Sequence, residues 1–292
     1  MSIEDKLTTI AENMQRVYTA GLDAGYRSGY EVAKAEQPTA AWCDYNAFWD
    51  GLQDLGDRTS YNYAFGTNWT DAMFVPKYKI TPTGNGADNM FKDSNITDLA
   101  TLLKNPELQD PDVALDFSNA ESLCSTFENS KVTTLPDIDI YSCKDMTRTF
   151  YGAKDLKAVN LLCPKKNGNY NKDTVYVETF DSCESLETVT FTVPGVGNAN
   201  GIITKVADAR GLYFGDSPNL TGGSVMNIIS ALGSPTKDTD KVYVAKAVFH
   251  QDAYDRAEEF YETTELRPYY TWAQFIALAT DKGWTIEIIS SK

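Results

Sequence analysis

The single histidine of the chain, His250, is the side chain best suited to acid–base chemistry at neutral pH. The 292-residue sequence contains no second histidine. Mechanisms and metal sites that need two imidazoles, such as those of the HExxH metalloproteases, are therefore excluded. His250 follows Phe249 at the end of an alternating apolar segment, where a structural hydrogen bond is favoured over a role as catalytic base.

Carboxylates are the other groups that could do chemistry, because the chain has 41 Asp and Glu residues. Asp137, Asp139 and Asp145 could together bind a cation, but solvated charge at a strand edge is the simpler interpretation. A facing carboxylate pair could hydrolyse a glycosidic bond, and the sequence leaves this open because the required separation is spatial. No nucleophile elbow, P-loop or calcium-loop motif occurs, and Gly195-Val196-Gly197 lies in a turn-rich segment. We therefore predict no enzyme, catalytic residue, cofactor or metal site.

The cysteines favour a structural role. They are odd in number and contain no CxxC pair: Cys43, Cys124, Cys143, Cys163 and Cys183. This spacing suits neither a disulfide scaffold nor a zinc site. We predict buried free thiols in a protein made in a reducing cytosol.

Charge and hydropathy exclude further classes of function. The chain has 26 Lys and Arg residues against its 41 acids, a net charge of −15, which argues against binding to nucleic acid or anionic lipid. No run approaches 18 apolar residues, so we predict no membrane insertion. Residues Met1 to Met14 carry acids where an export signal would be apolar.

An amphipathic helix is predicted at the N-terminus. Its apolar stripe has the 4, 3 spacing of heptads and comprises Ile3, Leu7, Ile10, Met14, Val17, Gly21 and Ala24. Three heptads suffice for a coiled coil, although the stripe could equally pack on the body of the same chain. We predict an oligomerisation helix over residues 1–36, which the Pro38 segment separates from the rest.

The middle of the sequence contains an internal repeat. Its copies are centred on Phe91, Phe127, Phe150, Phe180 and Phe214, which are 36, 23, 30 and 34 residues apart. The step of 30 includes the turn-rich segment Pro164 to Asn169, which we expect to be a surface loop.

Each copy combines two apolar spacings. Leu123, Met146 and Tyr176 lie four residues before their phenylalanines, which predicts a short helical turn. Apolar residues two apart, such as Val189 and Phe191, then predict a short strand. Since no copy can bury its apolar side alone, the copies must stack.

The fullest copy resembles a known repeat. Residues Thr179 to Phe191 read Thr-Phe-x-x-Cys-x-Ser-Leu-x-x-Val-x-Phe, which is similar to the BspA-like leucine-rich repeat of bacterial and phage proteins. The resemblance implies an α+β fold: a short, irregular leucine-rich-repeat solenoid with an N-terminal helix and α/β caps. The sequence departs from the pattern at Phe127, where no cysteine follows, and over Pro194 to Arg210.

The flanking segments resemble a narrower group. The likeness lies in three segments: the Ile10 to Asn13 helix, the aromatic run from Tyr45-Asn46-Ala47-Phe48-Trp49-Asp50 to Pro76-Lys77-Tyr78, and the Lys282 to Ile286 strand. They are similar to proteins encoded among the tail and structural genes of gut Firmicutes phages and prophages. Residues Phe249 to Tyr270 look like an insertion in that pattern.

Caps are expected at both ends of the repeats, giving four regions: the helix over 1–36, an aromatic cap over 37–88, repeats over 89–222 and a helix/strand cap over 223–292. Ser224 is the expected N-cap of a helix through Leu232. A strand over 241–249, a helix over 271–281 ending at Gly283, and a strand over 284–288 follow.

The outward side of the repeat strands is the candidate ligand face. We assign to it Lys157, Asn160, Thr188 and Thr190, together with the aromatic residues Tyr269, Tyr270 and Trp272. An extended polar face with exposed aromatics suits carbohydrate or protein recognition. The alternative is that the aromatics pack inside and the face is merely solvated.

The resemblance implies a structural protein of the phage virion, made in the bacterial cytoplasm. We expect it to bind itself, other virion proteins and a host-surface glycan or protein. A bacterial surface or secreted adhesin with the same repeat is the main alternative, and it would need an export signal upstream. A glycan hydrolase is the third hypothesis for the function, and it would need two facing carboxylates about 5 to 10 Å apart.

Overall fold

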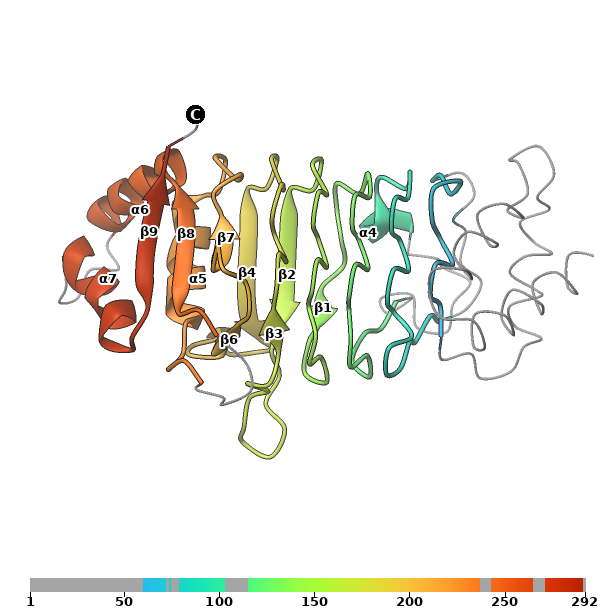
Figure 1. Cartoon of the computed structure of the whole chain (residues 1–292), viewed down its shortest axis with the longest axis horizontal. Coiled ribbons are helices and arrows are strands. Elements are labelled where there is room, and N and C mark those ends of the chain that lie inside the picture. The colour runs from blue at the N-terminus through green and yellow to red at the C-terminus, as the bar shows by residue number, and fades with distance from the viewer. Residues whose placement is uncertain are drawn as a thin grey trace, which may run out of the picture.

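The computed structural model describes residues 60–71, 74, 79–102, 115–236, 243–264 and 271–290. In these ranges the protein is a mixed α and β structure with several open sheets and few helices. The α+β class predicted from the sequence is confirmed at this level. Figure 1 shows successive segments of the chain lying side by side along the longest axis, with α5, α6 and α7 together at the C-terminal end.

A continuous stack of phenylalanine rings runs through the core. Its members are Phe65, Phe91, Phe127, Phe150, Phe180, Phe214 and Phe249. Neighbouring ring centroids are 4.8 to 5.8 Å apart, with interplanar angles of 4° to 28°. No ring in the stack is more than 1% exposed. We call the segment around each ring a unit; Phe65 and Phe249 add two units to the five read from the sequence.

Hydrogen bonds from the backbone join each unit to the next. The N–H of Phe91 donates to the carbonyl of Thr126 at 2.8 Å, and that of Phe127 to Thr149 at 2.8 Å. Phe65 and Phe150 donate in the same way to the residues that precede the next ring. The residues directly before and after a ring instead donate their N–H groups within their own unit, as Thr126 does to Leu123 and Glu128 to Ser125. The N–H groups around the ring are therefore all satisfied, alternately by the next unit and by their own.

The threonine that precedes three of the rings explains the Thr-Phe motif. The Oγ1 atoms of Thr126, Thr149 and Thr179 donate to main-chain carbonyls of the previous unit at 3.0, 3.0 and 2.8 Å. All three side chains are buried, where an unpaired hydroxyl would cost free energy. Each threonine therefore fastens its unit to the one before.

The short helical turn predicted in each repeat is wrong. The chain around Phe127 forms consecutive turns in which Ser125 and Asn129, two residues before and after the ring, both have a φ of 54°. The same pair of positions has positive φ around Phe91, Phe150 and Phe180. Gly152 occupies one of them, where a Cβ would collide with the Asn129 side chain. This alternation, and not a helix, directs every second N–H to the next unit.

Strands of neighbouring units pair in parallel on one side of the stack. In the first sheet, β1 (Ile138–Asp139), β2 (Ala158–Leu162) and β4 (Thr188–Val193) are parallel, and β5 (Gly197–Asn198) pairs with β4 antiparallel. In the second sheet, β3 (Val175–Tyr176) pairs with β6 (Lys205–Val206). Residues Val159, Leu161, Val189 and Phe191 point inward as predicted. Before β1, single parallel bridges and the short helix α4 (Leu99–Leu102) continue the arrangement.

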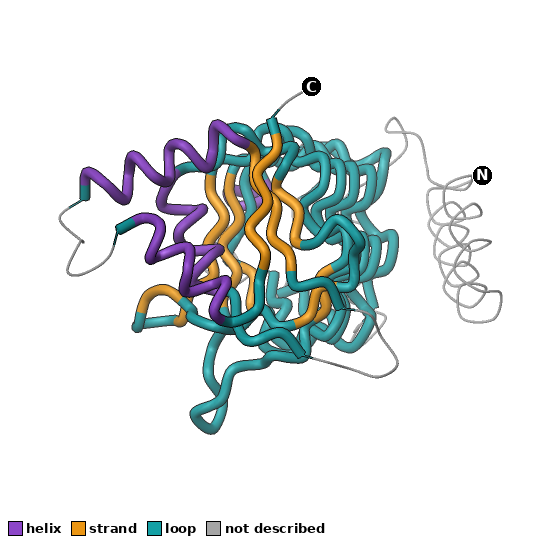
Figure 2. Tube along the Cα trace, turned by 60° about the vertical axis from the view of Figure 1, so that its left-hand side comes forward, coloured by secondary structure: helices purple, strands orange, loops and turns teal. Residues whose placement is uncertain are grey.

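The C-terminal region adds a third sheet flanked by helices. Strands β7 (Leu212–Phe214), β8 (Lys246–His250) and β9 (Thr285–Ile289) are all parallel. Helix α5 (Gly222–Ala231) precedes β8, α6 (Gln251–Thr263) follows it, and α7 (Trp272–Asp281) leads into β9. Figure 2 shows these helices beside the strands.

Several C-terminal boundaries differ from the predictions. The N-cap of α5 is Thr221, whose Oγ1 accepts from the Ser224 N–H at 3.3 Å; Ser224 itself lies inside the helix. Leu232 is the C-cap and not a helical residue. The strand predicted over 241–249 begins only at Lys246, and residues 241 and 242 lie outside the described ranges.

Other C-terminal predictions are confirmed. The structural role expected of His250 is that of N-cap to α6, with its Nδ1 accepting from the Asp252 N–H at 3.1 Å. Thr271 and Gln274 form a capping box at the start of α7, and Gly283 after its end has a φ of 98°. Helix α6 lies within the segment Phe249 to Tyr270, of which residues 265–270 are outside the described ranges; that this segment is an insertion stays a prediction.

The N-terminal end of the stack is aromatic. Phe65 packs edge-on against Trp69 and Phe74, with ring centroids 5.1 and 5.0 Å apart, and all three side chains are buried. The stripe from Ile3 to Ala24 and the domain boundary at residue 36 lie outside the described ranges. Self-association through the N-terminal helix therefore stays a prediction.

Truncation of a central ring tests the importance of the stack. We expect Phe150→Ala to lower the free energy of unfolding by about 3 to 5 kcal/mol, because the cavity would lie between two neighbouring rings. Phe260→Ala, at a ring that is 40% exposed, is the matched control and should cost about 1 kcal/mol or less. Urea titration followed by circular dichroism measures both. Equal losses in the two variants would contradict a dominant role for the stack.

Candidate functional site

The register of the first sheet brings three of the predicted ligand-face residues together. Asn160 lies opposite Thr190, and Ala158 lies opposite Thr188. The Oδ1 of Asn160 accepts from the hydroxyls of Thr190 at 2.8 Å and Thr192 at 2.9 Å, and its Nδ2 donates to Asp137 at 2.9 Å. These polar groups satisfy one another and form a row from Asp137, which precedes β1, across β2 and β4; Thr188 lies on the same strand as Thr190 but makes no hydrogen bond to the row that joins Asp137, Asn160, Thr190 and Thr192.

The remaining residues assigned to this face do not join that row. Lys157 is exposed just before β2. Trp272 was predicted to be an exposed aromatic, and this is wrong: it is 4% exposed and packs against Tyr254, Tyr261 and Phe275. The capping box at Thr271 turns the first residue of α7 inward. Tyr269 and Tyr270 lie outside the described residues.

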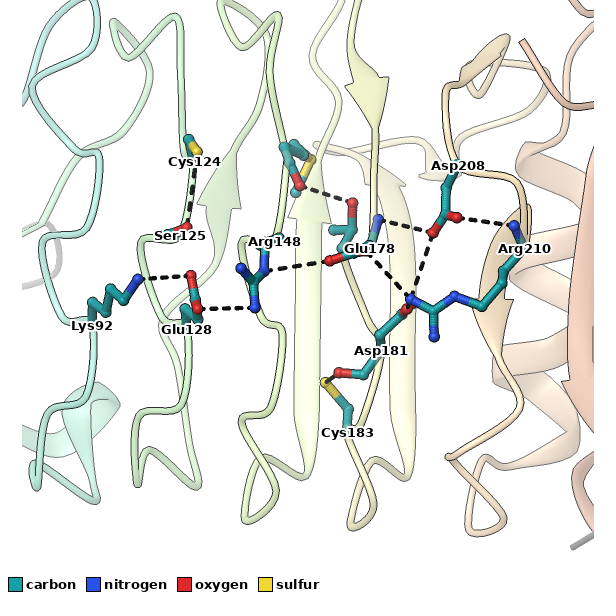
Figure 3. Close-up of polar contacts among 12 residues, drawn as sticks. Lys92, Cys124, Ser125, Glu128, Arg148, Glu178, Asp181, Cys183, Asp208 and Arg210 are labelled. Atoms are coloured by element: carbon teal, nitrogen blue, oxygen red, sulfur yellow. Dashed lines mark hydrogen bonds and ion pairs between the residues drawn. The ribbon is translucent and has the colours of Figure 1, made fainter. Parts of the chain in front are cut away.

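A second polar feature, which the sequence did not predict, runs beside the phenylalanine stack. We call it the charged row: Lys92, Glu128, Arg148, Glu178, Arg210, Asp181 and Asp208 (Figure 3). Its residues come from five successive units. Most follow their ring by one position or precede it by two, so the same turns that direct the backbone hydrogen bonds place these side chains in line.

Opposite charges alternate along the row. Lys92 Nζ lies 3.2 Å from Glu128 Oε2, and Arg148 Nη2 lies 3.1 Å from Glu128 Oε1. Arg148 Nε then lies 3.4 Å from Glu178 Oε2. The Glu128 side chain is only 4% exposed, so its two cations compensate a charge that water hardly reaches.

The row ends where three carboxylates meet one guanidinium. Arg210 contacts Asp181, Glu178 at 3.6 Å and Asp208 at 4.0 Å. The Asp181 side chain is 1% exposed, and its Oδ1 has no hydrogen-bond donor among the described residues. Burial raises the pKa of Asp181 to about 7, although Arg210 lowers it; Asp208, Glu178 and Asp216 raise it further.

This acid cluster does not suit the glycosidase alternative. A general acid with a raised pKa must touch the glycosidic oxygen, yet the Asp181 carboxyl is enclosed by the protein. The partly exposed carboxylate beside it, Glu178, is neutralised by Arg148 and Arg210. In this cluster the carboxylates and guanidinium groups hold one another in place.

A second buried carboxylate lies nearer the N-terminal end. Asp88 Oδ1 accepts from Ser122 Oγ at 2.5 Å and from the Cys124 N–H at 3.2 Å. Burial raises the pKa of Asp88 to about 6, these two hydrogen bonds lower it, and Asp145 raises it. Asp88 thus links two neighbouring units from within.

The aspartates considered for a cation serve the backbone instead. Asp139 accepts from the Tyr141 N–H at 2.8 Å and Asp145 from the Thr147 N–H at 2.8 Å, while Asp137 binds Asn160. Among the described residues no group of three or more His, Cys, Asp or Glu side chains could hold a metal ion.

The described cysteines are free thiols, as predicted, and burial keeps them protonated. Cys143, Cys163 and Cys183 are buried, which raises the pKa of the first two to about 12 and that of Cys183 further still. Cys124 is half-buried and its pKa is also raised by desolvation. A thiol with a raised pKa is a poor nucleophile.

Comparison with known proteins gives no assignment: no family, no curated protein and no solved structure matches this chain. Each helix in the described ranges is too short or too polar to cross a membrane.

The buried acids give the protein a defined pH dependence. Because the folded-state pKa of Asp181 is raised above its ordinary value, its contribution to stability is present at low pH and lost as the pH rises through about 7. We expect the free energy of unfolding of the wild type, relative to Asp181→Asn, to fall by a few kcal/mol between pH 5 and 8, since each pKa unit corresponds to about 1.4 kcal/mol.

Denaturant titrations at several pH values measure this difference. Asp88→Asn should remove a smaller dependence, which runs from the ordinary pKa of 3.8 to the raised pKa of about 6. Asp173→Asn, at a side chain that is 77% exposed, serves as control and should follow the wild type. A difference between wild type and Asp181→Asn that does not change with pH would contradict the raised pKa.

Proposed function

We propose that the phenylalanine-centred units form a BspA-like leucine-rich-repeat solenoid, and that the protein is a tail- or fibre-associated structural protein of a bacteriophage virion. The observation that carries the proposal is the unbroken stack of seven rings, since one contact repeated between neighbours is the physical basis of a solenoid. The Thr-Phe-x-x-Cys motif of Thr179 to Cys183 connects this architecture with the leucine-rich-repeat resemblance.

Recognition of a host surface or of another protein is the role we assign to the repeat body. The row of Asn160, Thr190 and Thr192 on the first sheet is polar and repeats across strands, as the surfaces of recognition solenoids are. The N-terminal helix would join several copies, and a multivalent particle binds a repetitive surface with higher avidity than one copy.

A bacterial surface or secreted adhesin with the same repeats is the competing assignment. Both assignments use the repeat body for recognition, so location separates them. Antibodies raised against the protein should label purified virions from an induced lysogen. The protein itself should co-sediment with these virions. Recovery in the envelope of cells that carry no prophage, and none in virions, would favour the adhesin.

Removal of residues 1–36 tests self-association. Because the heptad stripe from Ile3 to Ala24 is the predicted interface, we expect the shortened chain to have the mass of a monomer of roughly 28 kDa by light scattering, while the full chain has a multiple of 32.4 kDa. The shortened chain should retain the far-ultraviolet circular dichroism of a folded body. An oligomer of unchanged number after the deletion would place the interface elsewhere.

A further inference from the structure

The loop between β2 and β3 projects beyond the ends of the neighbouring strands (Figure 1). Its tip is a tight turn in which Lys166 and Asn169 exchange backbone hydrogen bonds, both at 3.1 Å. Asn167 and Gly168 between them have φ values of 52° and 78°, as a two-residue type I′ turn requires. The tip therefore has a fixed shape.

The base of the loop is fastened to the body. Nδ2 of Asn171 donates to the carbonyl of Cys143 at 2.7 Å and contacts that of Ile140 at 3.3 Å. Its Oδ1 accepts from the Asp173 N–H at 2.9 Å, and Thr174 Oγ1 donates to the Cys143 carbonyl at 2.8 Å. Hydrogen bonds within the loop therefore fix the shape of its tip, and hydrogen bonds to the body hold its base in place.

Two lysines of the loop are held over aromatic rings. Lys165 Nζ lies 4.5 Å from the centroid of the Tyr170 ring, and Lys166 Nζ lies 4.1 Å from that of Tyr141. Both lysines are exposed. A cation–π contact restrains an ammonium group without neutralising it. Lys166 also interacts electrostatically with the half-buried Asp139, so Lys165 carries the less compensated of the two charges.

Cations elsewhere in the described residues are mostly used internally. Seven lysines have a carboxylate oxygen within 4.0 Å: Lys79, Lys92, Lys131, Lys144, Lys154, Lys205 and Lys246. Lys282 donates to a main-chain carbonyl. Of the four described lysines without such a partner, three lie in this loop, at positions 165, 166 and 172, and the fourth is Lys157.

We propose that this loop is a binding surface for an anionic polysaccharide, whose phosphate or carboxylate groups the restrained ammonium groups of Lys165 and Lys166 would contact. The inference rests on the recognition role proposed above and names its ligand class. The exposed amide of Asn167 at the tip adds donors and an acceptor suited to sugar hydroxyls.

The chemistry of the loop favours a glycan over other anions. No large apolar side chain of the loop is exposed, whereas the centre of a protein–protein interface is apolar. A long nucleic acid gains affinity from many cations along its length, whereas this loop offers the two restrained ammonium groups of Lys165 and Lys166. A short cluster of cations, amides and tyrosines instead matches one or two charged sugars.

Binding of the full-length protein to defined polymers tests the proposal. We would measure affinity by biolayer interferometry for polygalacturonate, which carries carboxylates, and for a phosphate-bearing mannan. Neutral dextran, inorganic polyphosphate and oligothymidylate serve as comparisons. Lys165→Gln/Lys166→Gln is the test variant, and Lys131→Gln, which removes an exposed lysine 3.9 Å from Asp155, is the matched control.

The expected result is binding to at least one anionic polysaccharide, weakened about tenfold or more by the double substitution and less than twofold by the control. Which of the two polymers binds identifies the anion. No binding to either polysaccharide, or equal losses in both variants, would overturn the inference and leave the virion assignment intact. Equal or stronger binding of polyphosphate or oligothymidylate would overturn the assignment to a glycan.

Discussion

The parallel stacking of phenylalanine rings is the constraint on which the rest of the structure depends. For each ring to lie on the next at about 5 to 6 Å, the backbone must return to the same place and direction in every unit. In the four units around Phe91, Phe127, Phe150 and Phe180, left-handed residues two positions on either side of the ring achieve this, and Asn, Asp, Ser and Gly occupy most of these positions. The buried threonines and the charged row then follow from the same geometry, since they occupy fixed positions relative to the ring.

Irregular spacing in the sequence coexists with regular spacing in space. The rings are 23 to 36 residues apart along the chain. The distance between neighbouring ring centroids nevertheless varies by only about 1 Å along the stack. The additional residues between rings leave the core as loops and helices, of which the loop after β2 and the helix α5 are examples. A unit can therefore carry a different surface without altering its contact with its neighbours, and the loop proposed to bind a glycan is such an outer segment.

Much of the core could be predicted from the sequence, because phenylalanine, threonine and the inward strand residues recur in a recognisable order. The turn conformation could not, since a spacing of four residues is the same for a helical turn and for two successive β-turns. Phe65 and Phe249 lack the repeat motif around the other phenylalanines, so only their ring contacts show that they belong to the stack. The charged row depends on the register between units of unequal length, and a ring such as Trp272 gives no sign in the sequence of the side it faces. The cap at His250 was predictable because its hydrogen bond is local.

The direction of the hydrogen bonds between units has a mechanical consequence. These bonds and the ring contacts both run along the long axis, so a pull on the two ends of the stack loads successive interfaces in series. Under such tension the weakest interface opens first, and units would detach one after another at low force. A pull across the axis would instead shear many bonds of one interface at once and meet greater resistance. We therefore expect the orientation of the body relative to an applied load to decide how it fails.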